Sequence, residues 1–128
     1  MKKIEAYIQQ EKIKNIKAGL NEVFRDAIAQ GKRREGYPGL TIYNVEGKGA
    51  EYSTARIWGG RSFEVNVFPR TKLEIVVVDE DLEKTIGAVV SGCKKGSKKA
   101  EPQGKIFVYD IADVVRIRDE KRGEEVIK

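Results

Sequence analysis

Hydrophobic and polar residues alternate at the start of the chain. Ile4, Ala6 and Ile8 occupy every second position. Successive side chains of a β-strand point to opposite faces, so this pattern predicts a strand over residues 3–8 with one buried face. The same reasoning predicts three further strands, at residues 40–45, 73–78 and 105–111.

Apolar residues recur at intervals of three and four in two other stretches. In the first, they predict an amphipathic helix from about Glu11 to about Gln30, ended by Gly31. In the second, Asp79 is expected to cap a helix whose apolar face includes Cys93. This position indicates that Cys93 packs in the core and is not a reactive thiol.

Two stretches lack such periodicity and are predicted to be loops. Glycines interrupt the chain from Gly47 to about Arg61, which predicts a long, mobile loop. Alternation resumes at Phe63 and is interrupted by Pro69, which cannot donate a backbone hydrogen bond. Residues 94–104 are polar, basic and glycine-bearing, and are predicted to form the second loop.

The resulting order is strand, helix, strand, loop, strand, helix, strand. This is the arrangement of ferredoxin-like α+β folds, in which an antiparallel sheet carries two helices on one face. The length of 128 residues fits a single domain, residues 1–128, with one core. The strand at 73–78 carries apolar residues on both sides, so we expect the open sheet face to be buried in an oligomer.

The composition is that of a globular protein with excess positive charge. No apolar run approaches the length of about 18 residues that a membrane-spanning helix needs. The N-terminal residues lack the apolar stretch of a signal peptide, so we expect a cytoplasmic protein. The formal net charge of +5 favours anionic partners, such as nucleotides, nucleic acid or a membrane surface.

The residue types limit the chemistry. The chain has no histidine and one cysteine, which rules out histidine-based catalysis and argues against a zinc site. The acidic residues at 79–81 are interpreted as charges at a helix start and not as a catalytic pair. We therefore expect a binding protein, not an enzyme, with no metal held by a dedicated cluster.

Two glycine-bearing segments are candidates for binding phosphate. Gly47 and Gly49 flank Lys48, and glycines let backbone N–H groups approach an anion closely. This motif is shorter than a Walker A loop and lacks its Ser or Thr. Gly104 precedes Lys105 at the start of a predicted strand, where the ammonium group can meet a phosphate.

The final segment, residues 113–128, holds two further candidates. Arg116 and Arg118 lie in a stretch predicted to be extended, so both side chains would project from one face and clamp phosphate oxygens. On spacing alone, two exposed arginines that solvate an edge strand are the simpler interpretation. From Asp119 onward the tail is predicted to fray.

The long loop carries aromatic and basic residues suited to a partner. Tyr52 and Trp58 lie close in sequence to Arg56 and Arg61. Aromatic side chains can stack on nucleic-acid bases, but exposed loop aromatics more often contact a protein. We therefore interpret these four residues as a protein-binding surface.

Three blocks of the sequence resemble the PII family of nitrogen-regulatory signal proteins. They are the start MKKIEA, the segment EVNVFPRTKLEIVV at 64–77, and GKIFVYD at 104–110 followed by VVRIR at 114–118. The resemblance covers nearly the full chain. It implies a homotrimer of ferredoxin-like subunits, with ATP or ADP in the three clefts between subunits.

The resemblance also assigns roles to individual residues. The long loop, residues 47–61, would be the T-loop, and residues 94–104 would be the B-loop, from which Lys105 binds phosphate. Arg116 and Arg118 would reach the nucleotide from the neighbouring subunit. The implied nucleotide-binding residues are Thr41, Gly47, Gly49, Arg70, Glu74, Val76, Gly104, Lys105, Arg116 and Arg118.

Some positions depart from the family pattern. The tyrosine that the family uridylylates aligns with Phe63, which has no hydroxyl group. Ala50 and Glu51 stand where a glutamine helps to hold magnesium and 2-oxoglutarate, and a carboxylate there would repel a dicarboxylate. Arg70 keeps the charge of the lysine that pairs with that ligand. Magnesium remains an implied companion of the nucleotide, and the binding of 2-oxoglutarate stays open.

These features favour a regulator that binds ATP or ADP and controls a protein target, a membrane transporter or a metabolic enzyme, through its T-loop. Nitrogen regulation is the leading pathway. One alternative is a PII-like sensor of another pathway, such as inorganic carbon, without a 2-oxoglutarate response. The other is a basic nucleic-acid-binding module, for which the alternation of Phe107 and Tyr109 is a faint signal, so nucleic acid is not expected as a partner.

Overall fold

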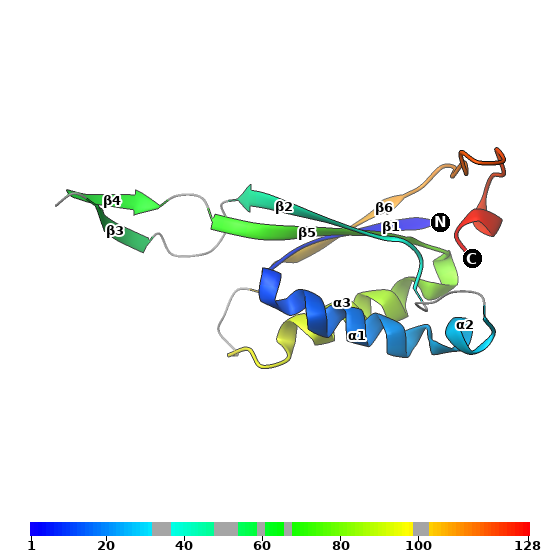
Figure 1. The fold of residues 1–128 in the computed structure, drawn as a ribbon, viewed down its shortest axis with the longest axis horizontal. Helices are drawn as coiled ribbons and strands as arrows, with labels where there is room; N and C mark the ends of the chain where they lie inside the picture. Colours follow the sequence, from blue (N-terminus) through cyan, green and yellow to red (C-terminus); the bar gives the residue numbers. More distant parts are fainter. Residues whose placement is uncertain (32–36, 48–53, 59–60, 66–67, 99–102) are drawn as a thin grey trace.

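The computed structural model describes residues 1–128 except 32–36, 48–53, 59–60, 66–67 and 99–102, with only the backbone described for the strand residues between 54 and 68. The described residues form a four-stranded sheet with helices on one face and a separate two-stranded hairpin at one end (Figure 1). The strands are β1 (Lys2–Ile8), β2 (Leu40–Gly47), β3 (Thr54–Trp58), β4 (Arg61–Val65), β5 (Phe68–Val77) and β6 (Lys105–Asp110). The helices are α1 (Ile13–Val23), α2 (Arg25–Ala29) and α3 (Leu82–Lys94), with 3-10 turns at Gln10–Lys12, Asp79–Asp81 and Glu124–Val126.

The four-stranded sheet has the order β2-β5-β1-β6, and each neighbouring pair is antiparallel. Both long helices, α1 and α3, cover the same face of this sheet (Figure 1). This arrangement confirms the ferredoxin-like α+β prediction. None of the helices in the described ranges is long and apolar enough to cross a membrane.

The covered face of the sheet holds the core. Ile4, Ala6 and Ile8 are almost completely buried there, as their alternation predicts. Gly92 of α3 lies so close to α1 that a Cβ atom would stand 2.9 Å from the Ile16 backbone nitrogen. Cys93 is buried and the burial raises the pKa of its thiol, which confirms its interpretation as a core residue.

The sequence predicts one continuous helix from about Glu11 to about Gln30. This prediction is wrong, because the segment forms two helices. The backbone leaves helical geometry at Phe24, which separates α1 from α2. No residue of α2 is fully buried, so burial does little to keep it in line with α1. Gly31 adopts a φ of +68° and its N–H bonds the Ile28 carbonyl, so the predicted stop is confirmed.

Two predictions about the long loop are also wrong. Strand β3 and part of β4 lie within residues 47–61 and pair as an antiparallel hairpin. Pro69 does not interrupt a strand, because it lies inside β5 opposite Glu46. At that level β1 has already ended, since its last pair joins Ile8 to Thr71, so the missing N–H of Pro69 removes no bond to β1.

The C-terminal segment is folded rather than frayed. The Gly123 N–H bonds the Val114 carbonyl at 3.0 Å, and Val115 bridges to Arg122. The chain turns at residues 117–119, so the prediction of an extended stretch over 114–118 is wrong at its end. Asp79, expected as a helix cap, instead accepts a hydrogen bond from the N-terminal ammonium group at 2.8 Å.

Candidate functional site

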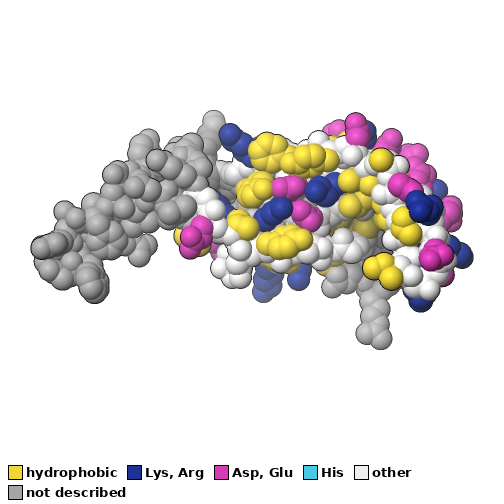
Figure 2. Space-filling view, turned by 90° about the horizontal axis from the view of Figure 1, so that it is seen from above, with side chains coloured by type: hydrophobic (Ala, Val, Ile, Leu, Met, Phe, Trp, Pro, Cys, Tyr) yellow, Lys and Arg dark blue, Asp and Glu magenta, His cyan; other side chains and the backbone are white. Residues whose placement is uncertain are grey.

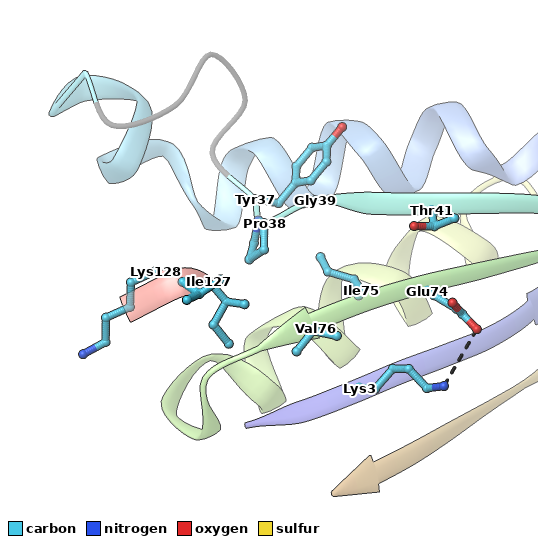
Figure 3. Close-up of a pocket in the computed structure, with 11 residues that line it drawn as sticks. Lys3, Tyr37, Pro38, Gly39, Thr41, Glu74, Ile75, Val76, Ile127 and Lys128 are labelled. Carbon is cyan, nitrogen blue, oxygen red and sulfur yellow. Dashed lines mark ion pairs between the residues drawn. The ribbon is translucent and has the colours of Figure 1, made fainter. Parts of the chain in front are cut away.

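A hollow of about 350 Å³ lies at the edge of the sheet between β2, β5 and the last residues of the chain, 126–128. Thr41, Glu74 and Val76, three of the residues implied by the resemblance, line it together (Figure 3). Its other walls come from Lys3, from residues 37–39 before β2, and from residues 126–128. We call this cavity the β2–β5 hollow.

Strand register explains why these residues meet. Thr41 and Glu74 are direct cross-strand partners, and Val76 is the partner of Lys3. Directly opposed residues share one face of a sheet, and residues two apart on one strand do so as well. Thr41, Glu74 and Val76 therefore lie on the same face of the sheet. Lys3 also holds Glu74, with Nζ 3.8 Å from its Oε1 atom (Figure 3).

Beside the hollow, the centre of the open face is a network of charges. Glu5 is only 6% exposed, and the Tyr7 hydroxyl donates a 2.6 Å hydrogen bond to it. The Lys72 ammonium lies 3.4 Å from Glu5 and 3.1 Å from Glu74. The Tyr7 hydrogen bond, followed by Lys72 and Lys3, lowers the pKa of Glu5. The Glu74 hydrogen bond is the main cause that raises the pKa of Lys72.

Aromatic rings surround this charged centre. The Lys72 ammonium lies 5.2 Å from the centre of the Tyr43 ring, and the Phe107 ring meets Tyr7 edge-on at 6.0 Å. Tyr43, Phe107 and Tyr109 are each 44–45% exposed. Figure 2, which views this face, shows charged side chains in the middle of yellow hydrophobic ones. The open face thus presents a large apolar rim around paired charges.

The glycine-bearing phosphate candidates lie on opposite edges of the sheet. Gly47 ends β2, whereas Lys105 begins β6 and Gly104 directly precedes it. Three inter-strand steps separate these edges, which is about 14 Å at about 4.8 Å per step. Gly104 also has a structural role, because its φ is +97° and a Cβ atom would stand 1.8 Å from the Tyr7 carbonyl oxygen.

The two arginine candidates lie in the turn that follows β6, at the end of the sheet near the N-terminus (Figure 1). Arg116 donates two hydrogen bonds to Asp119, from Nε at 2.8 Å and from Nη2 at 2.6 Å. Arg118 is exposed, and within the described residues its side chain has no hydrogen bond or ion pair. The two side chains therefore do not form the parallel clamp that an extended strand would give.

Several candidates cannot be placed with their side chains. Gly49 and Tyr52 lie outside the described residues, and only the backbone is described for Arg56, Trp58 and Arg61 in β3 and β4. Their roles stay predictions. Arg70 is described, and its guanidinium donates a 3.0 Å hydrogen bond to the Pro69 carbonyl.

The sequence pattern does not predict all of the residues that line the hollow, and it does not predict the ion-pair partner of Arg116. Tyr37, Pro38 and residues 126–128 contribute walls, although none of them is among the residues implied by the resemblance. The pairing of β2 with β5 positions residues 37–39, whereas the folded C-terminal segment brings residues 126–128 to the hollow. Asp119 is predicted to begin a frayed tail. It lies three residues after Arg116, however, and oppositely charged side chains at this spacing can form an ion pair.

Comparison with known proteins agrees with this architecture. Residues 1–121 match the family described as nitrogen regulatory protein P-II, and the chain belongs to that family. Nitrogen regulatory protein P-II 1 of Methanothermobacter thermautotrophicus is 35% identical over 127 residues, covering 99% of this chain and 97% of its own. The Pasteurella multocida P-II protein is 33% identical over 127 residues, covering 99% and 100%. The structure of B. subtilis GlnK matches with a TM-score of 0.68 and 25% identity, covering 98% and 97%.

Family membership gives this chain a regulatory signalling role of the nitrogen regulatory P-II type. The resemblance seen in its sequence blocks is thereby confirmed over almost the whole chain. Proteins of this family are regulatory signalling proteins rather than enzymes.

Proposed function

We propose that the protein is a homotrimeric sensor that binds ATP or ADP in the clefts between subunits and controls a protein target through its T-loop, residues 47–61. The target would be a membrane transporter or a metabolic enzyme. In this proposal the nucleotide is the signal and the T-loop is the output.

The observation that carries the proposal is the separation of the candidate residues within one subunit. Thr41, Glu74 and Val76 share the β2–β5 hollow, whereas Gly47 lies six residues beyond Thr41, about 20 Å at about 3.3 Å per residue. Lys105 lies on the opposite edge of the sheet. This wide separation within one subunit supports a site that is completed by parts from two subunits.

The open face of the sheet supports the oligomer. Tyr43, Phe107 and Tyr109 leave nearly half of their surfaces exposed, and Ile117 in the C-terminal turn is 95% exposed. Apolar surface of this extent commonly marks a contact with another protein. A second and third copy of this chain would cover it and bring the C-terminal turn of one subunit to the hollow of the next.

The hollow also suits an adenine nucleoside. Val76 supplies an apolar contact for a flat ring, while the Thr41 hydroxyl and the Glu74 carboxylate supply polar atoms that can fix its orientation. Lys105 and Arg118 are cations with no partner within the described residues, so both are available to a polyphosphate. The nucleotide can change the affinity of the protein for its target only by as much as the nucleotide's own affinity differs between the two T-loop states.

Calorimetry with ATP on Lys105→Ala tests the nucleotide site. Loss of one charge-assisted contact should weaken ATP binding about ten- to a hundredfold, since such bonds contribute about 1.5–3 kcal/mol. Lys14→Ala removes the same charge from an exposed position on α1 and should leave ATP binding unchanged. A wild-type protein that is monomeric in light scattering, or that binds neither ATP nor ADP at millimolar concentration, contradicts the proposal.

The pathway and second ligand belong to the same proposal. Nitrogen regulation is the leading assignment, with magnesium accompanying the nucleotide. Adding 2-oxoglutarate to the ATP titration separates a nitrogen sensor from a sensor of another pathway, such as inorganic carbon. A nucleic-acid titration across salt concentrations addresses the remaining alternative, because a steep salt dependence without ATP competition would favour it.

A further inference from the structure

The cations proposed to bind phosphate are not equally available. The side chains of Lys105 and Arg118 have no hydrogen bond or ion pair within the described residues. Arg116 differs from both, because two of its nitrogens are bound to the two oxygens of the Asp119 carboxylate. The pair is only partly exposed, at 35% for Arg116 and 31% for Asp119. It is therefore less screened by water than a fully exposed ion pair.

The bonds to Asp119 use the part of the guanidinium that recognises phosphate. Nε and Nη2 lie on one edge of the group, and an arginine binds a phosphate through two parallel N–H···O bonds from such an edge. A phosphate on this edge has to displace the carboxylate. A phosphate on the other edge, Nη1 and Nη2, remains close to the negative charge of Asp119. In either position, Asp119 weakens the attraction between Arg116 and the phosphate.

The backbone holds this pair together in advance. Arg116 and Lys121 are joined by a 2.8 Å bond from the Arg116 N–H to the Lys121 carbonyl, and the Glu120 N–H bonds the Arg116 carbonyl at 2.8 Å. Glu120 adopts a φ of +58°, which closes the turn. A second pair, between Arg122 and Asp113, links the two sides of the turn at its base. Little further ordering is needed for Asp119 to reach Arg116, so it is a persistent competitor.

We propose that Asp119 is a built-in competitor for phosphate at Arg116, which tunes the nucleotide affinity of the site. This inference rests on the nucleotide binding proposed above and names a residue that sets its strength. In the empty protein, Lys105 and Arg118 are ready to meet a phosphate, whereas Arg116 engages only when a phosphate group outcompetes the carboxylate. Ligands without phosphate do not compete with Asp119 and are indifferent to it.

The test is calorimetry on the full chain carrying Asp119→Asn, which keeps the size of the side chain and removes its charge. An ion pair at the surface is a weak competitor, so ATP should bind up to about fivefold more tightly to the variant. Adenosine affinity should not change, which separates competition for phosphate from a general change in the fold. In an Arg116→Ala background, Asp119→Asn should give no gain.

A matched control is available on α1. Glu22 pairs with Arg25 across the same spacing of three residues at 3.1 Å, so Glu22→Gln makes the same change in net charge at an ion pair outside the turn and should leave ATP affinity unchanged. If Asp119→Asn fails to fold in thermal unfolding, Asp119→Ser removes the same charge with a smaller polar group.

The outcomes for the two proposals are distinct. ATP affinity that is unchanged or weaker in Asp119→Asn, while the wild-type protein binds ATP, overturns the competitor role and leaves the proposed function intact. A wild-type protein that binds no adenine nucleotide overturns the proposed function. In that case tripolyphosphate decides the role of Asp119, since equal affinities of the wild-type protein and the variant for this probe overturn it.

Discussion

The two faces of the four-stranded sheet are built from alternate residues of the same strands, yet their surroundings differ completely. On β5, Leu73, Ile75 and Val77 are buried under the helices, whereas Lys72 and Glu74 on the other face form ion pairs around Glu5. One face is apolar and closely packed. The other combines paired charges with half-exposed aromatic rings.

This difference separates stability from recognition. Burial of apolar side chains on the covered face supplies most of the folding free energy of such a domain. Charged pairs on the open face contribute less, because each partner loses hydration when it is buried. Because these pairs lie beside the β2–β5 hollow, they hold charged groups at fixed positions on the open face. Charges at fixed positions suit the assembly of subunits and the orientation of a ligand.

Adjacent valines of β5 provide the sharpest test of the contrast. Val77→Ala removes two methyl groups from a fully buried site and should lower the free energy of unfolding by about 2–3 kcal/mol. Val76→Ala makes the same change on the open face, where it should cost less than about 1 kcal/mol without nucleotide. Urea unfolding at one fixed protein concentration measures both. Equal losses would show that the two faces are packed alike.

Two glycines of α3 test how closely the covered face is packed. Gly92→Ala places a methyl group against the backbone of α1 at Ile16 and should lower the free energy of unfolding by about 1–2 kcal/mol, after the gain in helix propensity. Gly87→Ala has open space around its new Cβ atom and should stabilise the protein by about 0.5–1 kcal/mol. A stabilised Gly92→Ala variant in the same urea experiment would contradict the close contact.

The smallest expected effect concerns the pH dependence of the open face. The pKa of Glu5 is lowered in the folded protein, so its ionised form contributes stability above the ordinary carboxyl pKa of about 4.3. That contribution is lost as the pH falls through the lowered folded pKa. Glu5→Gln should therefore melt below the wild-type protein at pH 7, and the difference should shrink below about pH 4.

An exposed carboxylate serves as the control for this pH series. Glu46→Gln changes the net charge equally at an exposed position of β2, away from any helix start, and should melt with the wild-type protein at every pH. A difference between Glu5→Gln and the wild-type protein that persists unchanged to pH 3 would show that the Glu5 charge is not the cause.

Local sequence patterns were sufficient to predict most strands of the sheet and to predict which side of each strand is buried. Alternation at Ile4, Ala6 and Ile8 identified both β1 and its covered face, and three-four spacing identified the helices. The hairpin of β3 and β4 was missed because glycines around it were read as a loop, although Gly59-Gly60 between two short runs is a common hairpin signal. The break at Phe24 had no periodic signal, because the spacing of apolar residues continues across it.

The sequence by itself determined the strand faces, the helix faces and the family to which this protein belongs, because these depend on spacing along the chain and on short motifs. Only the tertiary structure decided which distant residues share a site. Strand register placed Thr41 against Glu74, the folded C-terminal segment closed the β2–β5 hollow, and a tight turn joined Arg116 to Asp119. Contacts of this kind depend on how strands pair and turns close in three dimensions, which no local pattern specifies.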